Sequence, residues 1–259
     1  MTDSTQFLYA LLGGIVPSIL WLIFWLREDH LHPEPRKLIF GAFLLGMGAV
    51  ILAIPLQKFV TLFTSSTTEQ YILWASIEEI LKFAAAYFIA FHSKAFDEPI
   101  DAMMYLITVA LGFAALENSL FLMGQFQDGN ILHTVSYGNM RFIGATMLHV
   151  VASACTGLMF GLTFYLPKIV RFLAGLVGLA GGIALHSFFN IALQNITLQL
   201  TKIQLGHAIL HNALHLDTID TSFTDTLKVF AWVWGATILL LVFFEEVKSV
   251  HPRKQLIKN

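Results

Sequence analysis

Residues 100–123 have the sequence IDAMMYLITVALGFAALENSLFLM, an apolar run with a single glutamate, Glu117, near its far end. A helix rises about 1.5 Å per residue, so about 20 such residues cross the roughly 30 Å of hydrocarbon in a bilayer. A charged side chain at mid-depth costs at least about 2.5–3.5 kcal/mol. The stretch therefore predicts a membrane helix whose carboxylate needs a functional explanation.

The rest of the chain has the same membrane-like composition. Of its 259 residues, 56% are hydrophobic and 12% are charged, and the mean hydropathy is +0.71. Soluble domains carry about 25% charged residues, so a water-soluble globule is excluded. The formal charge of −2 gives no basic excess to bind nucleic acid, and the single cysteine, Cys155, allows no intrachain disulfide.

Seven apolar segments are long enough to span the bilayer, which predicts an all-α, polytopic helix bundle that forms one integral membrane domain over residues 1–259. The expected spans are Phe7–Leu26, Leu38–Leu56, Tyr71–Phe91, Ile100–Met123, Phe142–Leu166, Ile169–Ile196 and Val229–Phe244. The first is expected to be a retained helix, because Arg27, Glu28 and Asp29 stand where a signal peptide would have small residues for cleavage.

Basic residues predict the orientation of the spans, because cytoplasmic loops collect them. Ten of the 15 lysines and arginines follow odd-numbered spans: Arg27, Arg36, Lys37, Lys94, Lys168, Arg171, Lys248, Arg253, Lys254 and Lys258. The N-terminus is therefore expected outside the cell and the C-terminus inside, with residues 245–259 as a cytoplasmic tail.

One long connection, residues 197–228, precedes the last span at 229–244. In it His207, His211 and His215 recur every four residues beside apolar side chains. This pattern favours an amphipathic helix at the outer membrane surface. A single metal site is disfavoured, because His207 and His215 lie about 12 Å apart along a helix.

Away from the span ends, six ionisable side chains lie at depth in the predicted spans, on four different helices: Glu78, Glu79, Lys82, Glu117, His149 and His186. At helical rise, the acids and histidines lie about 9–15 Å below the outer surface. Polar residues that were merely tolerated would scatter in depth. The shared level predicts one water-accessible polar cavity in the outer leaflet.

The surrounding pattern indicates which helix faces meet at this cavity. In the sixth span, small residues continue into a polar pair at intervals of four: Ala174, Gly178, Gly182, His186 and Asn190. Small residues let a neighbouring backbone approach closely. In the fifth span Ser153 and Thr156 share the face of His149, and for these two and Asn118 hydrogen bonding between helices is the favoured role.

This set of residues fits amide hydrolysis. A glutamate can take a proton from water, an imidazole can position that water, and a second histidine with asparagine can bind the developing oxyanion. Other intramembrane protease chemistries lack their residues: every aspartate falls in a loop or at a span edge, and neither HExxH nor GxSG occurs. Glutamate and histidine chemistry remains.

Several motifs together resemble the PrsW family of bacterial membrane proteases. They are WLIFWLRED at 21–29, PEP at 33–35, SIEEILK at 76–82, GFAALEN at 112–118, RFIGATMLH at 141–149 and HSFFN at 186–190. The resemblance covers roughly residues 15–195, the expected catalytic core. It implies a glutamic-type intramembrane peptidase, related to CAAX-processing and bacteriocin-processing proteases, in the bacterial cytoplasmic membrane.

The resemblance also implies roles for six catalytic residues, whose matching positions are Glu78, Glu79, Glu117, His149, His186 and Asn190. Glu78 matches the water-activating base. His149 is expected to orient the water, and His186 with Asn190 to bind the oxyanion. The implied partner is a membrane-anchored protein substrate, such as an anti-sigma factor cut on its extracytoplasmic side.

No cofactor is expected, but zinc remains an alternative. Its ligands would be Glu78, Glu117, His149 and His186, since glutamate and histidine both bind this metal. The rival class of function is a proton-coupled transporter or channel that uses the same intramembrane glutamates and histidines. A non-catalytic membrane scaffold is the third class.

Overall fold

The computed structural model describes residues 3–29, 32–127, 144–211 and 221–252, and every regular element in these ranges is helical. In chain order the helices are α1 (Asp3–Glu28), α2 (Arg36–Thr61), α3 (Thr67–Ile89), α4 (Asp101–Gln127), α6 (Thr146–Leu162), α7 (Lys168–His211) and α8 (Thr221–Lys248). Helices α1, α2, α4, α7 and α8 contain segments long and apolar enough to cross a membrane. The prediction of an all-α, polytopic membrane bundle is confirmed.

The other two helices, α3 and α6, correspond to the third and fifth predicted spans. Helix α3 carries Glu78, Glu79 and Lys82 on one side, and these charges lower its mean hydropathy. Helix α6 has only 17 residues, and the first residues of the span expected here, Phe142 and Ile143, lie outside the described part of the chain. These two helices carry half of the predicted site residues.

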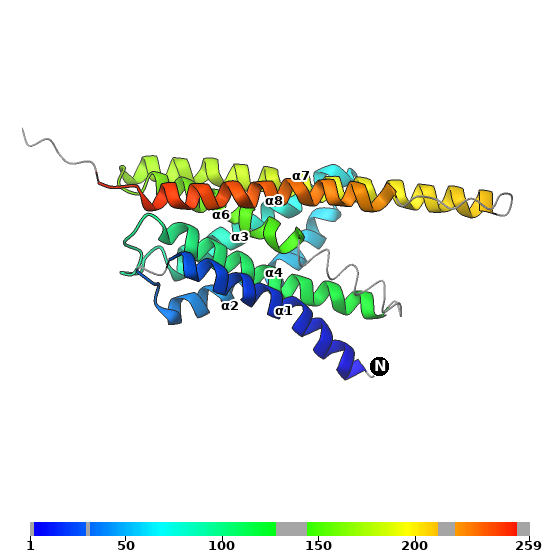
Figure 1. The fold of residues 1–259 in the computed structure, drawn as a ribbon, viewed down its shortest axis with the longest axis horizontal. Helices are drawn as coiled ribbons and strands as arrows, with labels where there is room; N and C mark the ends of the chain where they lie inside the picture. Colours follow the sequence, from blue (N-terminus) through cyan, green and yellow to red (C-terminus); the bar gives the residue numbers. More distant parts are fainter. Residues whose placement is uncertain (1–2, 30–31, 128–143, 212–220, 253–259) are drawn as a thin grey trace, which may run out of the picture.

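Helix α4 is the centre of the bundle. Every residue from Asp101 to Ala115 is buried, as expected for a helix that is apolar on all sides and surrounded by protein. Helices α1 and α2 pack against it, and so does α6, which in turn packs against α7 and α8. Figure 1 shows α7 and α8 side by side along the long axis, with α1, α2 and α4 as a second group.

Glycines permit the closest helix contacts. A Cβ atom on Gly112 of α4 would lie 2.0 Å from the carbonyl oxygen of Phe43 in α2. Between α7 and α6, a Cβ on Gly182 would lie 2.3 Å from the carbonyl oxygen of Ala152, and one on Gly178 would lie 2.5 Å from that of Cys155. The small-residue stripe predicted for the sixth span therefore faces α6, as its spacing indicated.

Helix α7 continues beyond the expected end of its span at Ile196 and reaches His211. No proline or glycine occurs between Ile196 and Leu205, so nothing in that stretch interrupts the helix. The side chains of His207 and His211, and all of His215, lie outside the described residues. The surface location of this segment stays a prediction.

Candidate active site

The structure brings five of the six predicted catalytic residues together from four helices. Helix α3 contributes Glu78 and Glu79, α4 contributes Glu117, α6 contributes His149 and α7 contributes His186. All except Glu117 are buried, with exposed fractions of 5% or less. Residues that are far apart in the sequence therefore meet in one buried polar cluster.

Glu79 is the carboxylate on which most of these groups converge. Its Oε1 atom accepts a hydrogen bond of 2.6 Å from Nζ of Lys82 and lies 2.8 Å from Nδ1 of His186. Its Oε2 atom accepts a 2.8 Å hydrogen bond from Oγ of Ser153. Because a carboxylate only accepts hydrogen bonds, Nδ1 of His186 carries a proton here, and in the neutral ring its Nε2 atom then has a free lone pair.

Lys82 links Glu79 to the first histidine. Its Nζ atom lies 2.8 Å from Nδ1 of His149 and 4.5 Å from the centre of the Phe113 ring, a cation–π contact. An ammonium group has donors only, so Nδ1 of His149 is the acceptor. The ring proton of His149 is therefore on Nε2, which donates a 2.8 Å hydrogen bond to Oε2 of Glu117. The two histidines have opposite tautomers.

The two carboxylate oxygens of Glu78 differ in their hydrogen bonding. Nε2 of Gln57, on α2, donates a 2.7 Å hydrogen bond to its Oε1 atom. Its Oε2 atom is buried and has no hydrogen-bond partner among the described residues. Nε2 of His186 lies 3.6 Å from this oxygen. Two acceptor atoms thus face each other at a separation that a shared hydrogen-bond donor, such as water, would bridge.

Asn190 is the predicted residue that the structure does not bring into this cluster. It is partly buried, one turn beyond His186, and among the described residues no hydrogen bond joins its side chain to the other five. Asn118 instead donates a 3.0 Å hydrogen bond to Oγ1 of Thr146, an interhelical bond of the kind predicted for it. Ser153 also bonds between helices, but its acceptor is the site carboxylate Glu79.

The sequence analysis missed Gln57 as a member of the site. Its signal was a polar side chain immediately after the apolar run of the second span, where Lys58 also occurs. Periodicity on α2 alone gives no reason to pair this amide with α3. Trp74 of α3 donates to the Gln57 carbonyl oxygen at 3.2 Å, which fixes the two helices at this level.

Glu117 is the most accessible member of the cluster. Its side chain is 31% exposed, against 3% for its partner His149. Since the other carboxylates are enclosed, the site opens toward its surroundings on the Glu117 side.

One group of residues has the donor atoms for a metal ion. Glu78, His149 and His186 each offer a ligand atom, and these atoms lie within 4.8 Å of one another. The hydrogen bond from His186 to Glu79 is typical of a metal-binding histidine. On His149, however, Nε2 is protonated while Lys82 donates to Nδ1, so metal binding through Nε2 requires this proton to leave. The donor set fits an ion after that one rearrangement.

Comparison with known proteins agrees with the geometry. A family model described as "PrsW family intramembrane metalloprotease" matches residues 34–215, a range that contains all six predicted catalytic residues. Protease PrsW of Geobacillus kaustophilus is 27% identical over 163 residues, which is 62% of this chain and 69% of that protein. Protease PrsW of Bacillus subtilis is 29% identical over 159 residues, 60% of this chain and 66% of its own length.

No solved structure matches the chain. The family model, however, covers well over half of the sequence, and the helices it covers carry every contact of the buried cluster. The family and the apolar helices together show that this chain is a multi-pass protein of the bacterial membrane. The chain belongs to the PrsW family of intramembrane proteases.

Proposed function

We propose that this protein hydrolyses a peptide bond of a membrane-anchored protein with a water molecule activated by Glu78. The observation that carries the proposal is the pair of acceptors formed by Oε2 of Glu78 and Nε2 of His186, 3.6 Å apart. A water that donates one hydrogen to each would keep its oxygen lone pairs directed away from both. Such a water is oriented for attack on a carbonyl carbon.

In the proposed reaction, Glu78 accepts the proton of this water as its oxygen attacks the peptide carbonyl. Gln57 holds the other carboxylate oxygen, so the reactive one keeps its direction. Glu79 fixes the His186 ring through Nδ1, which leaves Nε2 to accept the second hydrogen of the water. Glu78 then gives its proton to the leaving amine.

His149 has the opposite role in this scheme. Its Nε2–H group is a donor, and a donor is what a developing oxyanion needs. It bonds to Glu117, the most accessible carboxylate, so an incoming carbonyl oxygen would take the place of Glu117 as acceptor. We therefore assign water positioning to His186 and oxyanion stabilisation to His149, the reverse of the expectation from sequence, with no role for Asn190.

The proposed cleavage site lies in the outer leaflet. His186 is about 27 Å along α7 from Lys168, and Glu117 is about 24 Å along α4 from Asp101, at 1.5 Å per residue. The charge pattern predicts that both helices begin at the cytoplasmic side. A substrate anchored in the membrane would present its extracytoplasmic juxtamembrane segment at this depth, and an anti-sigma factor is our candidate.

A second candidate chemistry is metal-assisted hydrolysis, favoured by the clustering of Glu78, His149 and His186. These residues would hold the ion, with Glu117 as the fourth donor, and the ion would supply Lewis-acid activation of water. Element analysis of the purified protein distinguishes the two. We expect less than one equivalent of zinc or iron per chain and cleavage that survives chelators. A stoichiometric metal lost in His186→Ala would establish the second candidate.

The experiment that tests the function compares membrane proteomes of cells with the wild-type protein and with Glu78→Gln. An uncut membrane-anchored protein should accumulate in the variant and be cleaved by the wild-type protein in proteoliposomes. Proton-linked solute uptake by the same vesicles, with no cleavage of any accumulated protein, would instead support the transporter class.

A further inference from the structure

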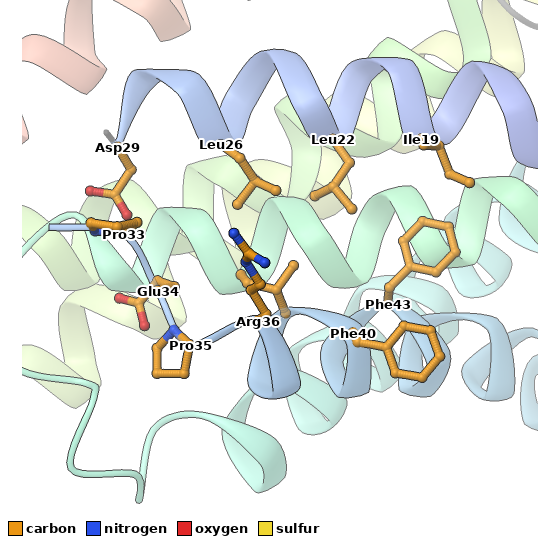
Figure 2. A pocket seen from close by; sticks show the side chains of 11 residues that line it. Ile19, Leu22, Leu26, Asp29, Pro33, Glu34, Pro35, Arg36, Phe40 and Phe43 are labelled. Atoms are coloured by element: carbon orange, nitrogen blue, oxygen red, sulfur yellow. The ribbon is translucent and has the colours of Figure 1, made fainter. Parts of the chain in front are cut away.

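A second feature of the molecule lies between α1 and α2, on helices that contribute only Gln57 to the proposed active site. Both helices pack against α4, and between them is a cavity of about 670 Å³. Its walls are apolar for most of their length: Ile19, Leu22, Leu26, Ile39, Phe40 and Phe43. Figure 2 shows Ile19, Leu22 and Leu26 along α1 and Phe40 and Phe43 along α2, with Asp29, Glu34 and Arg36 at one end.

The length of this groove fits one leaflet of a bilayer. From Ile19 to Asp29 the wall extends about 15 Å along α1, at 1.5 Å per residue. This is half of the roughly 30 Å hydrocarbon thickness. A transmembrane peptide would require an apolar surface across the whole thickness, whereas an acyl chain that begins at the headgroup level requires half.

The polar end of the groove has a buried carboxylate with one oxygen that accepts no hydrogen bond from the described residues. Asp29 is 5% exposed, and its Oδ2 atom has no hydrogen-bond partner among the described residues. Burial, together with the nearby charge of Asp101, raises the pKa of Asp29 to about 6, so the group is still mainly ionised at neutral pH. A buried anion of this kind is stabilised by a cation that can donate hydrogen bonds.

The neighbouring carboxyl, Glu34, does not need such a partner. It accepts a hydrogen bond from the Tyr105 hydroxyl and shares another with Asp101. Burial and the bond to Asp101 raise the pKa of Glu34 to about 9, so it is neutral at pH 7. Lys248 and His32 contribute favourable charge to Asp29, but its buried Oδ2 atom still lacks a hydrogen-bond donor among the described residues.

A positive group lines the same end of the groove. Arg36, the first residue of α2, is exposed and lines the groove, and Figure 2 shows its guanidinium extending from α2 toward α1. A guanidinium is well suited to bind phosphate. The end of the groove thus offers an acceptor for an ammonium and a donor for a phosphate, next to an apolar channel.

We propose that this groove binds an aminophospholipid, with one acyl chain between α1 and α2, its primary ammonium on Asp29 and its phosphate on Arg36. The charge order matches a zwitterionic headgroup, and a primary amine can donate to the buried oxygen where a quaternary one cannot. A metal ion fits less well, because among the described residues only the Glu78 cluster gathers ligand atoms closely. The inference is independent of the proposed peptidase activity.

The test uses the full chain in mild detergent and native mass spectrometry. The probes are phosphatidylethanolamine, phosphatidylcholine and phosphatidylglycerol with identical acyl chains. We expect the wild-type protein to retain the ethanolamine lipid selectively. Asp29→Asn should weaken that binding about tenfold, the order expected for one charge-assisted hydrogen bond, and leave the choline lipid unaffected. Glu246→Gln, an exposed acid at the end of α8, is the matched control.

A second pair of variants tests the apolar channel. Ile19→Trp adds volume inside the groove and should lower retention of all three lipids. Ile23→Trp adds the same volume at a lipid-exposed position of the same helix that does not line the groove, and should change nothing. Equal retention of the three lipids by the wild-type protein, or unchanged binding in Asp29→Asn, would overturn the proposal.

Photocrosslinking keeps the proposal testable if Asp29→Asn does not fold. Wild-type protein is placed in nanodiscs with phosphatidylethanolamine that carries a diazirine on one acyl chain. Crosslinks concentrated between residues 19 and 43 would support the lipid site. Crosslinks spread evenly over the outer helices, or a copurifying polypeptide crosslinked in this groove, would overturn it.

Discussion

Nζ of Lys82 lies 2.8 Å from Nδ1 of His149, although the two residues belong to α3 and α6 and are both buried. The same nitrogen lies 2.6 Å from Glu79. One ammonium group thus compensates the buried carboxylate and sets which nitrogen of the histidine carries the proton. Stability and reactivity of the site both depend on this lysine.

Lys82→Met should therefore reduce stability and activity together. Removing one member of a buried ion pair typically costs about 3–5 kcal/mol, because the remaining charge is left uncompensated. Thermal unfolding in detergent would measure the loss. The double variant Lys82→Met/Glu79→Gln should unfold at a higher temperature than Lys82→Met alone, since it removes the stranded charge. If the double variant were the less stable of the two, Lys82 would not be compensating Glu79.

Glu78→Gln should abolish peptide hydrolysis without unfolding the protein. The amide keeps an oxygen that can accept from Gln57 but cannot take a proton from water, and loss of a general base typically costs about 100- to 10,000-fold in rate. Initial cleavage rates in proteoliposomes provide the measurement. Glu69→Gln, an exposed acid on the same helix, serves as the control and should retain full activity. Normal rates in Glu78→Gln would assign the base elsewhere.

Gly182→Leu should inactivate the protein, whereas Gly181→Leu should not. A Cβ on Gly182 would lie 2.3 Å from the carbonyl oxygen of Ala152, but one on Gly181 meets nothing within 4 Å. The larger side chain at 182 would push α7 from α6 and separate His186 from His149, whose rings are 5.0 Å apart. Cleavage rate and thermal stability should both fall for the first variant only. Equal effects at both positions would contradict the packing described here.

Glu34→Gln should reduce the loss of stability at alkaline pH. The pKa of Glu34 is raised from 4.5 to about 9 in the folded protein, so between these values the folded state binds more protons than the unfolded state. The free energy of unfolding then falls as pH rises. Melting temperatures measured from pH 5 to 9 should decline more steeply for the wild-type protein than for Glu34→Gln. Asp29, with a pKa near 6, contributes a smaller decline in both proteins.

The control for this comparison is Glu246→Gln, which removes an exposed acid and should keep the wild-type pH dependence. If the melting temperatures of the wild-type protein and Glu34→Gln changed with pH in the same way over the whole range, the pKa of Glu34 would not be raised in the folded protein.

The sequence predicted the helices and the common level of the site residues because both follow from quantities that a single chain displays. Apolar length identified the spans, and helical rise placed Glu78, Glu117 and His186 at a common level. The i+4 stripe also identified the face of α7 that packs on α6, through Gly178 and Gly182. These inferences need only the geometry of one helix at a time.

The remaining features depend on how helices are rotated against each other. Asn190 shares a helix face with His186, yet among the described residues no hydrogen bond joins its side chain to the cluster, whereas Gln194, one turn further along α7, accepts a hydrogen bond from Tyr71 of α3. Gln57 reaches Glu78 only because α2 crosses α3 at that level. The tautomers of the two histidines follow from Lys82 and Glu79, partners on another helix. No periodicity within one segment contains that information.

The burial of α4 on every side has a consequence for how this chain tolerates mutation. From Asp101 to Ala115 the helix is buried in protein, so a substitution there is not tolerated merely because the new side chain is hydrophobic. Volume and shape decide instead, as in the interior of a water-soluble enzyme. A deep mutational scan would therefore find the strictest size limits along α4, although its hydropathy is that of an ordinary membrane span.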